Sequence, residues 1–593
     1  MTAAAAPMDK LDAPADAGVN GPEGGLLADW DSIDWDRAQQ NVRRLRQRIF
    51  TASREGDLAK VRNLQKLMLR SLSNTLISVR RVTEINAGRK TAGVDGQVVL
   101  TAPGKAELVR FIQGRGGREA RPVRRVFIPK SGSGRKRRPL GIPVIIDRCH
   151  QARAANALEP EWEARFEARS YGFRPGRGCH DAIGVIYNTL KGRHPRRVWI
   201  LDADLTAAFD RVDHDLLLAQ LGTFPAREMV RRWLKAGVVE RGVLTPTEQG
   251  TPQGGVISPV LLNVALHGIE AAAGVRYHLT GRHAGESMPD SPVVVRYADD
   301  LVAMCHSREA AQQIKAQLAE WLAPRGLVFN EDKTRIVHAE AGFDFLGFNV
   351  RRYPSGKLLI KPSKKAVRRV RNRLREEVRA LRGAPPLAVL RALNPIVRGW
   401  SAYYRTVVSK EVFVSLDSYL WQLTYRWALP RHPKKSKHWI VDRYFGRFNQ
   451  ARQDRWVFGD RDTGAYLVKF SWTKIIRHQL VKGGASPDDP TLTDYWATRR
   501  RRTAPLPLDR ATLRLLREQK GRCQLCDQLL LHADQAPQSP TGWEQWLRTT
   551  RKAIKARNIA YQGAETPDGV QLRLAHASCI KRATTRSTRT LHA

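Results

Sequence analysis

The feature that most constrains the fold of this chain is a pair of adjacent aspartates, Asp299 and Asp300, set between two apolar runs. The stretch Val294–Val302 predicts two β-strands joined by a tight turn, with the acids at its tip. Adjacent carboxylates between hydrophobic strands are costly to pack, because each charge needs a partner or water. A bound divalent cation would satisfy them, whereas a solvated hairpin tip is the simpler interpretation of a lone Asp-Asp pair. The rest of the chain must decide between the two.

The charge of the chain points to a polyanionic partner. Its 593 residues, enough for several domains, carry 101 Lys+Arg against 57 Asp+Glu, a formal net charge of +44. Such a surplus favours nucleic acid, whose counterion release would dominate affinity. No run approaches the roughly 18–20 apolar residues of a membrane span, so we expect no membrane partner. The first residues lack the basic start and apolar core of a signal peptide, and six cysteines are too few for a disulfide scaffold. We therefore expect a protein of the cytoplasm.

The N-terminal part divides into a tail and a helical segment. Residues 1–28 are rich in Ala, Gly, Pro and Asp, and we expect them to be disordered. Residues 29–110 are expected to form a helical N-terminal extension, because from Trp35 to Ile85 apolar residues recur at three- and four-residue steps, with Arg and Lys on the other faces. The turn cluster Thr91–Gly96 closes this helical pattern.

A third carboxylate follows another predicted strand. The stretch Val198–Leu205 is apolar and ends in acids, with Asp204 near its end. Phosphoryl transfer by two metal ions, roughly 3.5–4 Å apart, requires carboxylates that converge from separate strands. A strand bearing Asp204 beside the Asp299–Asp300 hairpin would supply that geometry. Asp202 and Asp210 are expected to be structural or to support the site from behind.

Basic and glycine-rich segments surround these acids in the sequence. Val126–Lys130 and Arg135–Pro143 predict a hairpin whose cations could hold a triphosphate from two sides, or could make a general nucleic-acid contact. The loop Gly250–Pro259 contains glycines that would let the backbone approach a nucleotide closely, although such a stretch can also be only a turn. Further on, Glu309–Leu322 predicts a helix and Phe343–Phe348 a strand.

Taken in order, these segments resemble a known family. The motifs SYGFRPGRG, LDADLTAAFD, GTPQGGVISP, RYADD and FDFLGF lie between Arg121 and Val350. Their order is similar to that of reverse transcriptases of the group II intron maturase type. The resemblance implies an α+β fold: a right-hand polymerase whose fingers and palm, with an antiparallel sheet, occupy residues 111–350.

The resemblance also assigns roles to single residues. It implies that Asp204, Asp299 and Asp300 are catalytic and hold Mg²⁺. Lys130 and Arg138 would hold the phosphates of an incoming dNTP. The remaining implied contacts are Phe209, a steric gate against the ribose 2′-OH; Gln253, against nucleotide and template; and Lys333, a candidate proton donor to pyrophosphate.

Residues 351–498 resemble the α-helical thumb, or maturase X domain, of the same family. Residues 351–510 contain 36 Lys+Arg and 12 Asp+Glu, a net of +24, together with 7 of the 15 tryptophans. Because basic and aromatic residues interleave, we favour an RNA contact over an ordinary solvated face. The stretch Leu393–Arg405 carries the resemblance, which implies binding of intron RNA and help in splicing.

Residues 499–593 are expected to hold a basic linker, Arg499–Arg502 and the prolines after it, and a small zinc-binding domain. Two pairs with two-residue spacing are typical of a tetrahedral Zn²⁺ site. The pairs are Cys523 with Cys526 and His576 with Cys579. Their position resembles the C-terminal HNH endonuclease of intron proteins. However, His532 is the only histidine between the pairs, and it lacks the expected acidic and histidine neighbours. We therefore predict a module that binds target DNA and do not assign it endonuclease activity.

The leading hypothesis is an RNA-directed DNA polymerase that binds its group II intron RNA, assists splicing and supports intron mobility by target-primed cDNA synthesis. Its partners would be the intron RNA, an RNA template with a DNA primer, dNTPs and target DNA. Two alternatives stay open: a splicing maturase whose polymerase is idle, and a host-adopted reverse transcriptase, for example in defence. The intact acids argue against the first, and an intron structure around the reading frame would argue against the second.

Overall fold

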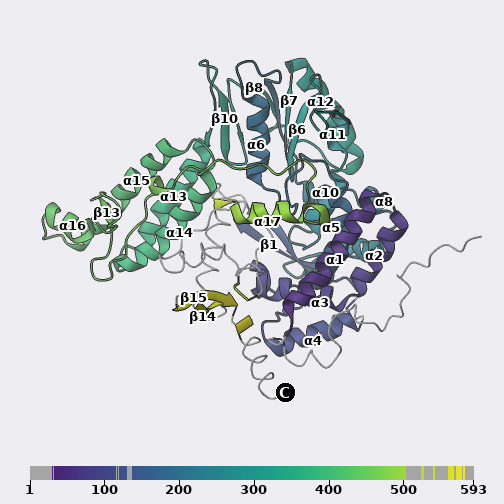
Figure 1. Ribbon diagram of the computed structural model, residues 1–593, viewed down its shortest axis with the longest axis horizontal. Helices are drawn as coiled ribbons and strands as arrows, with labels where there is room; N and C mark the ends of the chain where they lie inside the picture. Colours follow the sequence, from purple (N-terminus) through teal and green to yellow (C-terminus); the bar gives the residue numbers. More distant parts are fainter. Residues whose placement is uncertain are drawn as a thin grey trace, which may run out of the picture.

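A computed structural model gives the structure of the chain. It describes Trp30 and residues 33–114, 116–117, 119–129, 137–502, 523–525, 539–540, 559–566, 569–576 and 579–580. The predicted tail 1–28, Lys130, Cys526 and His532 lie outside the described residues. Figure 1 shows a body of helices and sheets from which a group of long helices projects to one side.

Four helices form the N-terminal layer, and the periodic apolar pattern predicts the first three of them. They are α1 (Trp35–Arg54), α2 (Leu58–Arg70), α3 (Leu72–Arg80) and α4 (Ala102–Gln113). Each begins at a residue whose side chain accepts backbone N–H groups of the first turn, which satisfies donors that a helix start leaves unpaired. These capping residues are Asp34, Asp57, Ser71 and Thr101. The apolar faces of α1 and α2 pack on α5 (Ile145–Glu163).

The predicted basic hairpin forms in a four-stranded sheet, here called the hairpin sheet, with strand order β2-β1-β4-β5. Strand β1 (Val123–Pro129) pairs antiparallel with β2 (Arg137–Ile142) and parallel with β4 (Val238–Glu240), which pairs with β5 (Val243–Thr245). The hairpin arms project beyond the core, because Phe127 and Ile128 remain exposed while Ile142 is buried.

A second four-stranded sheet, the central sheet, has the order β6-β7-β3-β8 and is antiparallel throughout. Its strands are β6 (Val293–Tyr297), β7 (Asp300–Cys305), β3 (Trp199–Asp204) and β8 (Arg335–His338). Alternate residues of β7 enter different cores, as expected for a strand that is covered on both faces. Leu301 and Ala303 pack in the core that includes α12 (Arg308–Leu322), and Val302 and Met304 in the core that includes α6 (Cys179–Leu190).

The stretch predicted as one strand over Phe343–Phe348 is two strands. Strand β9 (Phe343–Phe345) pairs with β10 (Phe348–Arg352) across a two-residue turn, and β11 (Leu358–Pro362) completes this sheet. The turn residues Leu346 and Gly347 both have positive φ, 50° and 84°, which matches the twist of a tight hairpin. The aromatic residues alternate only as far as Phe345, and Gly347 and Phe348 are out of step with that alternation, which marks the turn.

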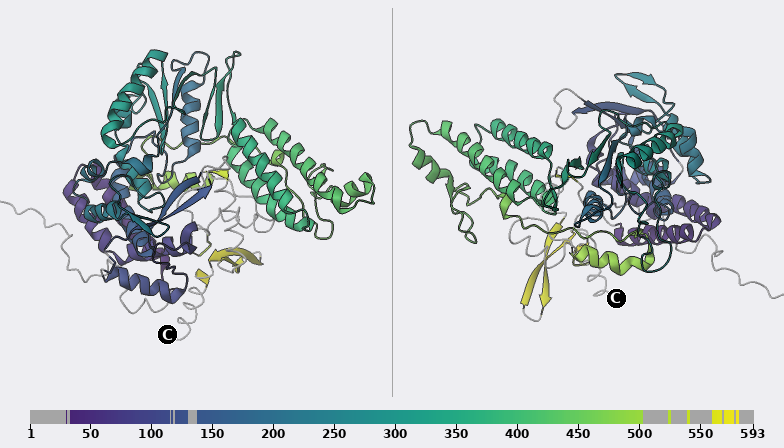
Figure 2. Two further views of the ribbon diagram at one scale, coloured as in Figure 1. Left: turned by 180° about the vertical axis from the view of Figure 1, so that it is seen from behind. Right: turned by 90° about the horizontal axis from the view of Figure 1, so that it is seen from above.

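Three long helices form what we call the arm: α13 (Lys364–Ala380), α14 (Pro386–Tyr404) and α15 (Lys410–Ala428). The hydroxyls of Tyr403 and Tyr404 at the end of α14 donate to the carbonyls of Leu346 and Gly347, which ties the arm to the β9–β10 turn. Seen from above, the arm extends away from the N-terminal helices (Figure 2).

The remaining elements connect or flank these layers. The helices are α7 (Ala208–Arg211), α8 (His214–Leu221), α9 (Arg227–Lys235), α10 (Ser258–Ala265), α11 (Ile269–Ala272), α16 (Lys437–Tyr444) and α17 (Thr493–Arg502). The strands are β12 (Phe445–Gly446), β13 (Val457–Phe458), β14 (Ile559–Thr566) and β15 (Gly569–His576). Short helical turns are Arg81–Ile85, Ala87–Lys90, Ala323–Arg325, Leu429–Arg431, Phe470–Trp472 and Pro490–Leu492.

Residues 476–502 return from the arm to the body instead of forming a free linker. Asp488 pairs with Arg46 of α1, and Asp489 pairs with Arg54, each at 2.7 Å between the charged atoms. The basic run that was predicted to begin a linker at Arg499 lies within α17, which ends at Arg502. Arg499 itself lies 3.3 Å from the buried carboxylate of Asp181. Charge pairing with the body therefore keeps this segment helical.

Candidate active site

The predicted hairpin brings all three aspartates to one edge of the central sheet. Tyr297 of β6 pairs with Asp300 of β7, so Ala298 and Asp299 form a two-residue turn, and Ala298 has a φ of 58°. Asp300 is in turn the direct cross-strand partner of Asp204, the last residue of β3. Directly opposed residues have Cβ atoms roughly 4.5–5.5 Å apart. The three aspartates therefore lie at one edge of the sheet: Asp204 at the end of β3, Asp300 at the start of β7, and Asp299 in the β6–β7 turn.

A buried arginine holds the turn in place. Arg296, whose exposed fraction is 2%, donates to the Asn263 side-chain oxygen at 2.8 Å and to the Ala298 carbonyl at 3.2 Å. A third bond joins the Arg296 guanidinium to the hydroxyl of Ser170, in the loop that carries the SYGFRPGRG motif. Such charge-assisted bonds fix the backbone of the turn from behind.

The same loop approaches the turn so closely that only glycine fits. Asn263 donates to the carbonyl of Gly172 at 2.9 Å, which holds the loop against the hairpin. A Cβ atom placed on Gly172 would lie 2.2 Å from the backbone nitrogen of Ala298. No role was predicted for Gly172, Asn263 or Arg296. Arg296 and Asn263 sit in apolar stretches where a buried polar partner is unusual, and that was the available signal.

Burial and the repulsion between neighbouring carboxylates disfavour the ionised forms of Asp299 and Asp300 when no cation is bound. Burial, then the neighbouring carboxylates of Asp299 and Asp204, raise the pKa of Asp300 to about 7. Burial also raises the pKa of Asp299, and that of Asp202 to about 6, although Arg335 lies 3.4 Å from the Asp202 carboxylate. Groups with such shifts cluster at functional sites.

The donor set fits hard divalent cations. All three aspartates offer carboxylate oxygens, the ligands that Mg²⁺ prefers, and they come from separate strand positions. In this structure the ammonium of Lys333 forms an ion pair with Asp204, so a cationic side chain already lies against the cluster. The Asn330 backbone N–H donates to the Asp204 carbonyl at 2.7 Å, which places the Lys333 segment beside β3.

Three of the residues predicted to contact a nucleotide have contacts or charge effects that the structure describes. The ring of Phe209 in α7 meets Phe173 edge to face, with centroids 5.9 Å apart. The Gln253 carbonyl accepts the Gly141 N–H of β2 at 2.6 Å, so the GTPQGG loop touches the hairpin sheet. Arg138 is exposed on β2, and its charge lowers the pKa of Asp299 against the larger effect of burial. Lys130 lies outside the described residues.

A second candidate centre involves sulfur and imidazole. Cys523, His576 and Cys579 bring ligand atoms within 4.8 Å of one another. His576 is the last residue of β15, and its Nδ1 lies 3.7 Å from the Cys579 sulfur. Thiolates and imidazole suit Zn²⁺, which takes four such ligands in structural sites. The predicted fourth ligand, Cys526, lies outside the described residues.

Within the described ranges, no helix is both long enough and apolar enough to cross a lipid bilayer.

Three family models match the chain in succession. They are the N-terminal domain of reverse transcriptase over residues 30–112, reverse transcriptase (RNA-dependent DNA polymerase) over 128–350, and the group II intron maturase-specific domain over 367–445. The first covers the N-terminal helices, and the second covers the central sheet and the hairpin sheet except for most of β1. The third covers the arm from within α13 to the start of β12.

Curated relatives agree with these matches. The chain is 36% identical to Protein YkfC of Escherichia coli, covering 46% of this chain and 79% of that protein. It is 30% identical to the group II intron-encoded protein LtrA of Lactococcus lactis, covering 42% of this chain and half of LtrA. A telomerase chain from Candida albicans aligns at 14% identity with a TM-score of 0.31, covering 55% and 64% of the two chains, which is too remote to carry an argument. The chain belongs to the group II intron-encoded reverse transcriptase/maturase family, and its enzyme class is RNA-directed DNA polymerase.

Proposed function

We propose that Asp204, Asp299 and Asp300 are the catalytic residues at which this chain copies RNA into DNA. The observation that carries the proposal is the convergence of the three carboxylates at the β3–β7 pairing and the β6–β7 turn. A turn that is braced by a fully buried arginine and an obligatory glycine is pre-organised for precise placement of metal ligands.

Two Mg²⁺ ions held by these aspartates would lower the pKa of the primer 3′-OH and neutralise the leaving phosphates. The surrounding residues position the substrates. Arg138, on the exposed arm of the hairpin sheet, and Lys130 would hold the dNTP phosphates. Lys333, already paired with Asp204, would lie close enough to give a proton to pyrophosphate.

Sugar selection is proposed for Phe209. The residue follows the catalytic strand by five positions, and its ring is held edge to face by Phe173. A ring held in that place would contact a ribose 2′-OH and leave deoxyribose free. Gln253, on the loop that bridges α7 and β2, is proposed to lie against the nucleotide and the template base.

We further propose five domains with the boundaries that the sequence predicts. They are a tail (1–28), an N-terminal extension (29–110), fingers and palm (111–350), the thumb or X domain (351–498), and a C-terminal part (499–593) that begins at the end of α17 and continues as a linker with a zinc module. The arm would be the thumb, which grips a duplex of RNA template and DNA primer. Most basic residues of α13 are exposed, apart from its buried stripe of Val370, Leu374 and Val378, as an RNA-binding face requires, whereas Arg371 and Arg373 are half-buried.

The partner proposed for the arm is the RNA of the chain's own group II intron. The relative LtrA is itself an intron-encoded protein, and the maturase-specific domain matches here over residues 367–445. Binding would help the intron fold and splice, and cDNA synthesis primed at target DNA would support its mobility. The cluster of Cys523, His576 and Cys579, completed by Cys526, would hold Zn²⁺ in a module that binds that target DNA.

Primer extension tests the polymerase directly. Purified protein would receive an RNA template annealed to a DNA primer, with dNTPs and Mg²⁺, alongside the Asp299→Ala/Asp300→Ala variant. We expect cDNA from the wild type alone, with RNA affinity unchanged in the variant. A wild type that binds intron RNA and accelerates its splicing but yields no cDNA would refute the polymerase and leave a splicing maturase. Equal extension by the variant would remove the assignment of the aspartates.

A further inference from the structure

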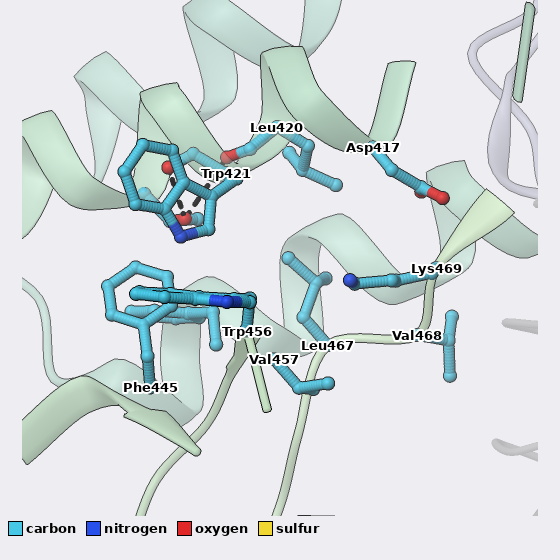
Figure 3. Close-up of a pocket in the computed structure, with 11 residues that line it drawn as sticks. Asp417, Leu420, Trp421, Phe445, Trp456, Val457, Leu467, Val468 and Lys469 are labelled. Atoms are coloured by element: carbon cyan, nitrogen blue, oxygen red, sulfur yellow. Dashed lines mark hydrogen bonds between the residues drawn. The ribbon is translucent and has the colours of Figure 1, made fainter. Parts of the chain in front are cut away.

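An open groove runs along the outer face of the arm, far in sequence from the aspartates. One wall is helix α15, and the other is the segment that carries Trp456, Lys469 and Ser471. The groove has a volume of about 480 Å³ and opens to solvent. Its inner end continues into a narrow aromatic pocket, where Trp421 and Trp456 face each other in Figure 3.

One tryptophan of the groove, Trp456, is exposed to solvent and is not part of the core. The Trp456 residue is 55% exposed, although its neighbours Val457 and Phe458 are buried. Its ring meets Trp421 edge to face, with centroids 6.1 Å apart and an interplanar angle of 83°. Trp421 is fixed from the other side by Tyr425, which stacks on it at 5.3 Å between centroids. A rigid aromatic slot with one free face is the form of a stacking platform.

Polar groups line the slot in a fixed arrangement. Asp417 accepts the backbone N–H groups of Phe470 and Ser471, at 2.7 and 3.1 Å, so the far wall is tied to α15. The indole N–H of Trp421 is buried and has no acceptor among the described residues. The Lys469 side chain extends toward the slot in Figure 3, and its ammonium is 2.6 Å from the Asp454 carboxylate.

The surface beside the groove is cationic. On the adjoining faces of α13 and α15, the Arg371 guanidinium bonds to Ser415 and lies over the ring of Tyr419, and Arg375 bonds to the Tyr419 hydroxyl. These residues lie within the segment whose net charge is +24. A polyanion bound along this face would pass the mouth of the slot.

We propose that the slot takes one unpaired nucleobase of a bound single-stranded RNA segment. The base would stack on Trp456 with a polar edge toward the Trp421 N–H and Gln422, while its backbone phosphates lie toward Lys469, Arg371 and Arg375. The inference rests on the proposed RNA binding by the arm and adds a specific contact to it. The exposed ring of Trp456, the unpaired indole N–H of Trp421 beside it and the flanking cations fit a base with its phosphates better than an aliphatic peptide side chain, which needs neither the donor nor the cations.

Photo-crosslinking tests the proposal with the full-length protein. The probe is a short oligouridylate that carries one 4-thiouridine, a base analogue that cross-links to side chains it touches. Trypsin cuts after Arg455 and Arg461, so the slot gives the peptides Trp456–Arg461 and Glu411–Arg426. We expect cross-links on both peptides, and we expect fully duplex RNA to compete poorly because its bases are not free.

Matched variants decide whether stacking is responsible. Trp456→Ala should remove the cross-link on Glu411–Arg426 and weaken oligouridylate binding by roughly 5- to 100-fold, whereas Trp456→Phe should retain both. Trp439→Ala is the control, because Trp439 is an exposed tryptophan of the same region (38%) that does not line the groove. Cross-links elsewhere on the protein with none on the two slot peptides would overturn the proposal, as would an unchanged yield in Trp456→Ala. Capture of a peptide or a duplex instead would also overturn it.

The polymerase assay separates the two claims. Trp456→Ala should still extend a primer on RNA, because the groove lies on the arm and not at the aspartates. A wild type that fails to make cDNA would count against the proposed polymerase, while the slot would be judged by its cross-links alone.

Discussion

Replacing Gly172 by alanine should disable the catalytic turn while leaving the fold in place. The new Cβ would lie 2.2 Å from the Ala298 nitrogen and 2.9 Å from both the Ala298 Cα and the Tyr297 carbonyl carbon, where ordinary contact begins at 3.4 Å. The obstructing atoms are backbone, so the turn that carries Asp299 and Asp300 must move by more than about 1 Å. A misplacement of that size can cost a reaction roughly 10²-fold.

The assay is single-turnover primer extension on RNA, with RNA affinity and thermal unfolding measured on the same preparations. We expect extension to slow by about 100-fold, with a loss of stability of about 1–3 kcal/mol from overpacking. Gly383→Ala is the matched control, because a Cβ at Gly383 meets nothing within 4 Å. The reasoning is refuted if Gly172→Ala extends primers at the wild-type rate, or if Gly383→Ala is equally impaired.

Three further predictions address other parts of the chain. Phe209→Ala should allow incorporation of ribonucleotides, and the preference for dNTPs over ribonucleotides should fall by roughly 10- to 100-fold in single-nucleotide incorporation. An unchanged preference would show that Phe209 is not the steric gate. Chelating Zn²⁺ should increase hydrogen exchange only beyond residue 505, and uniform exchange before and after chelation would contradict the metal site. Burial first, and then the charge of Glu167, raise the pKa of Glu270 to about 7. The contribution of Glu270 to the free energy of unfolding is therefore present below its ordinary pKa near 4.5 and is lost as the pH rises toward 7. Glu270→Gln should therefore gain up to about 3 kcal/mol relative to wild type between pH 4 and pH 8 in urea denaturation, and a constant difference would argue against the shift.

The catalytic edge could be predicted from sequence because its signals are local. The apolar runs around Asp299 and Asp300 and the apolar run that leads to Asp204 are each short and bounded by polar residues, as buried strands are, and pairing them needs only that they share a sheet. The bracing by Arg296 was not predictable in this way. The apolar stretch around Arg296 indicates burial, but it does not identify the partners Ser170 and Asn263, which lie more than 30 residues away.

Two elements differ from the sequence prediction for similar reasons. The β9–β10 turn at Leu346 and Gly347 divides an aromatic-rich stretch that suits a strand, and the turn is held by hydroxyls from α14, far along the chain. Arg499 looked like part of a linker because four arginines in a row resemble a solvated charge run. Its partner Asp181, buried at the start of α6, is what anchors it.

The most direct test of the central claim is iron-mediated backbone cleavage. Fe²⁺ substituted for Mg²⁺ generates radicals that cut the chain near the bound metal, and the fragments are read by mass spectrometry without any need for activity. The three-aspartate account predicts cuts at two separated places, around residue 204 and around residues 299–300, both lost in Asp204→Asn and both suppressed by excess Mg²⁺. Cuts confined to one of these segments, or cuts that persist in Asp204→Asn, would contradict a metal site shared by the two strands.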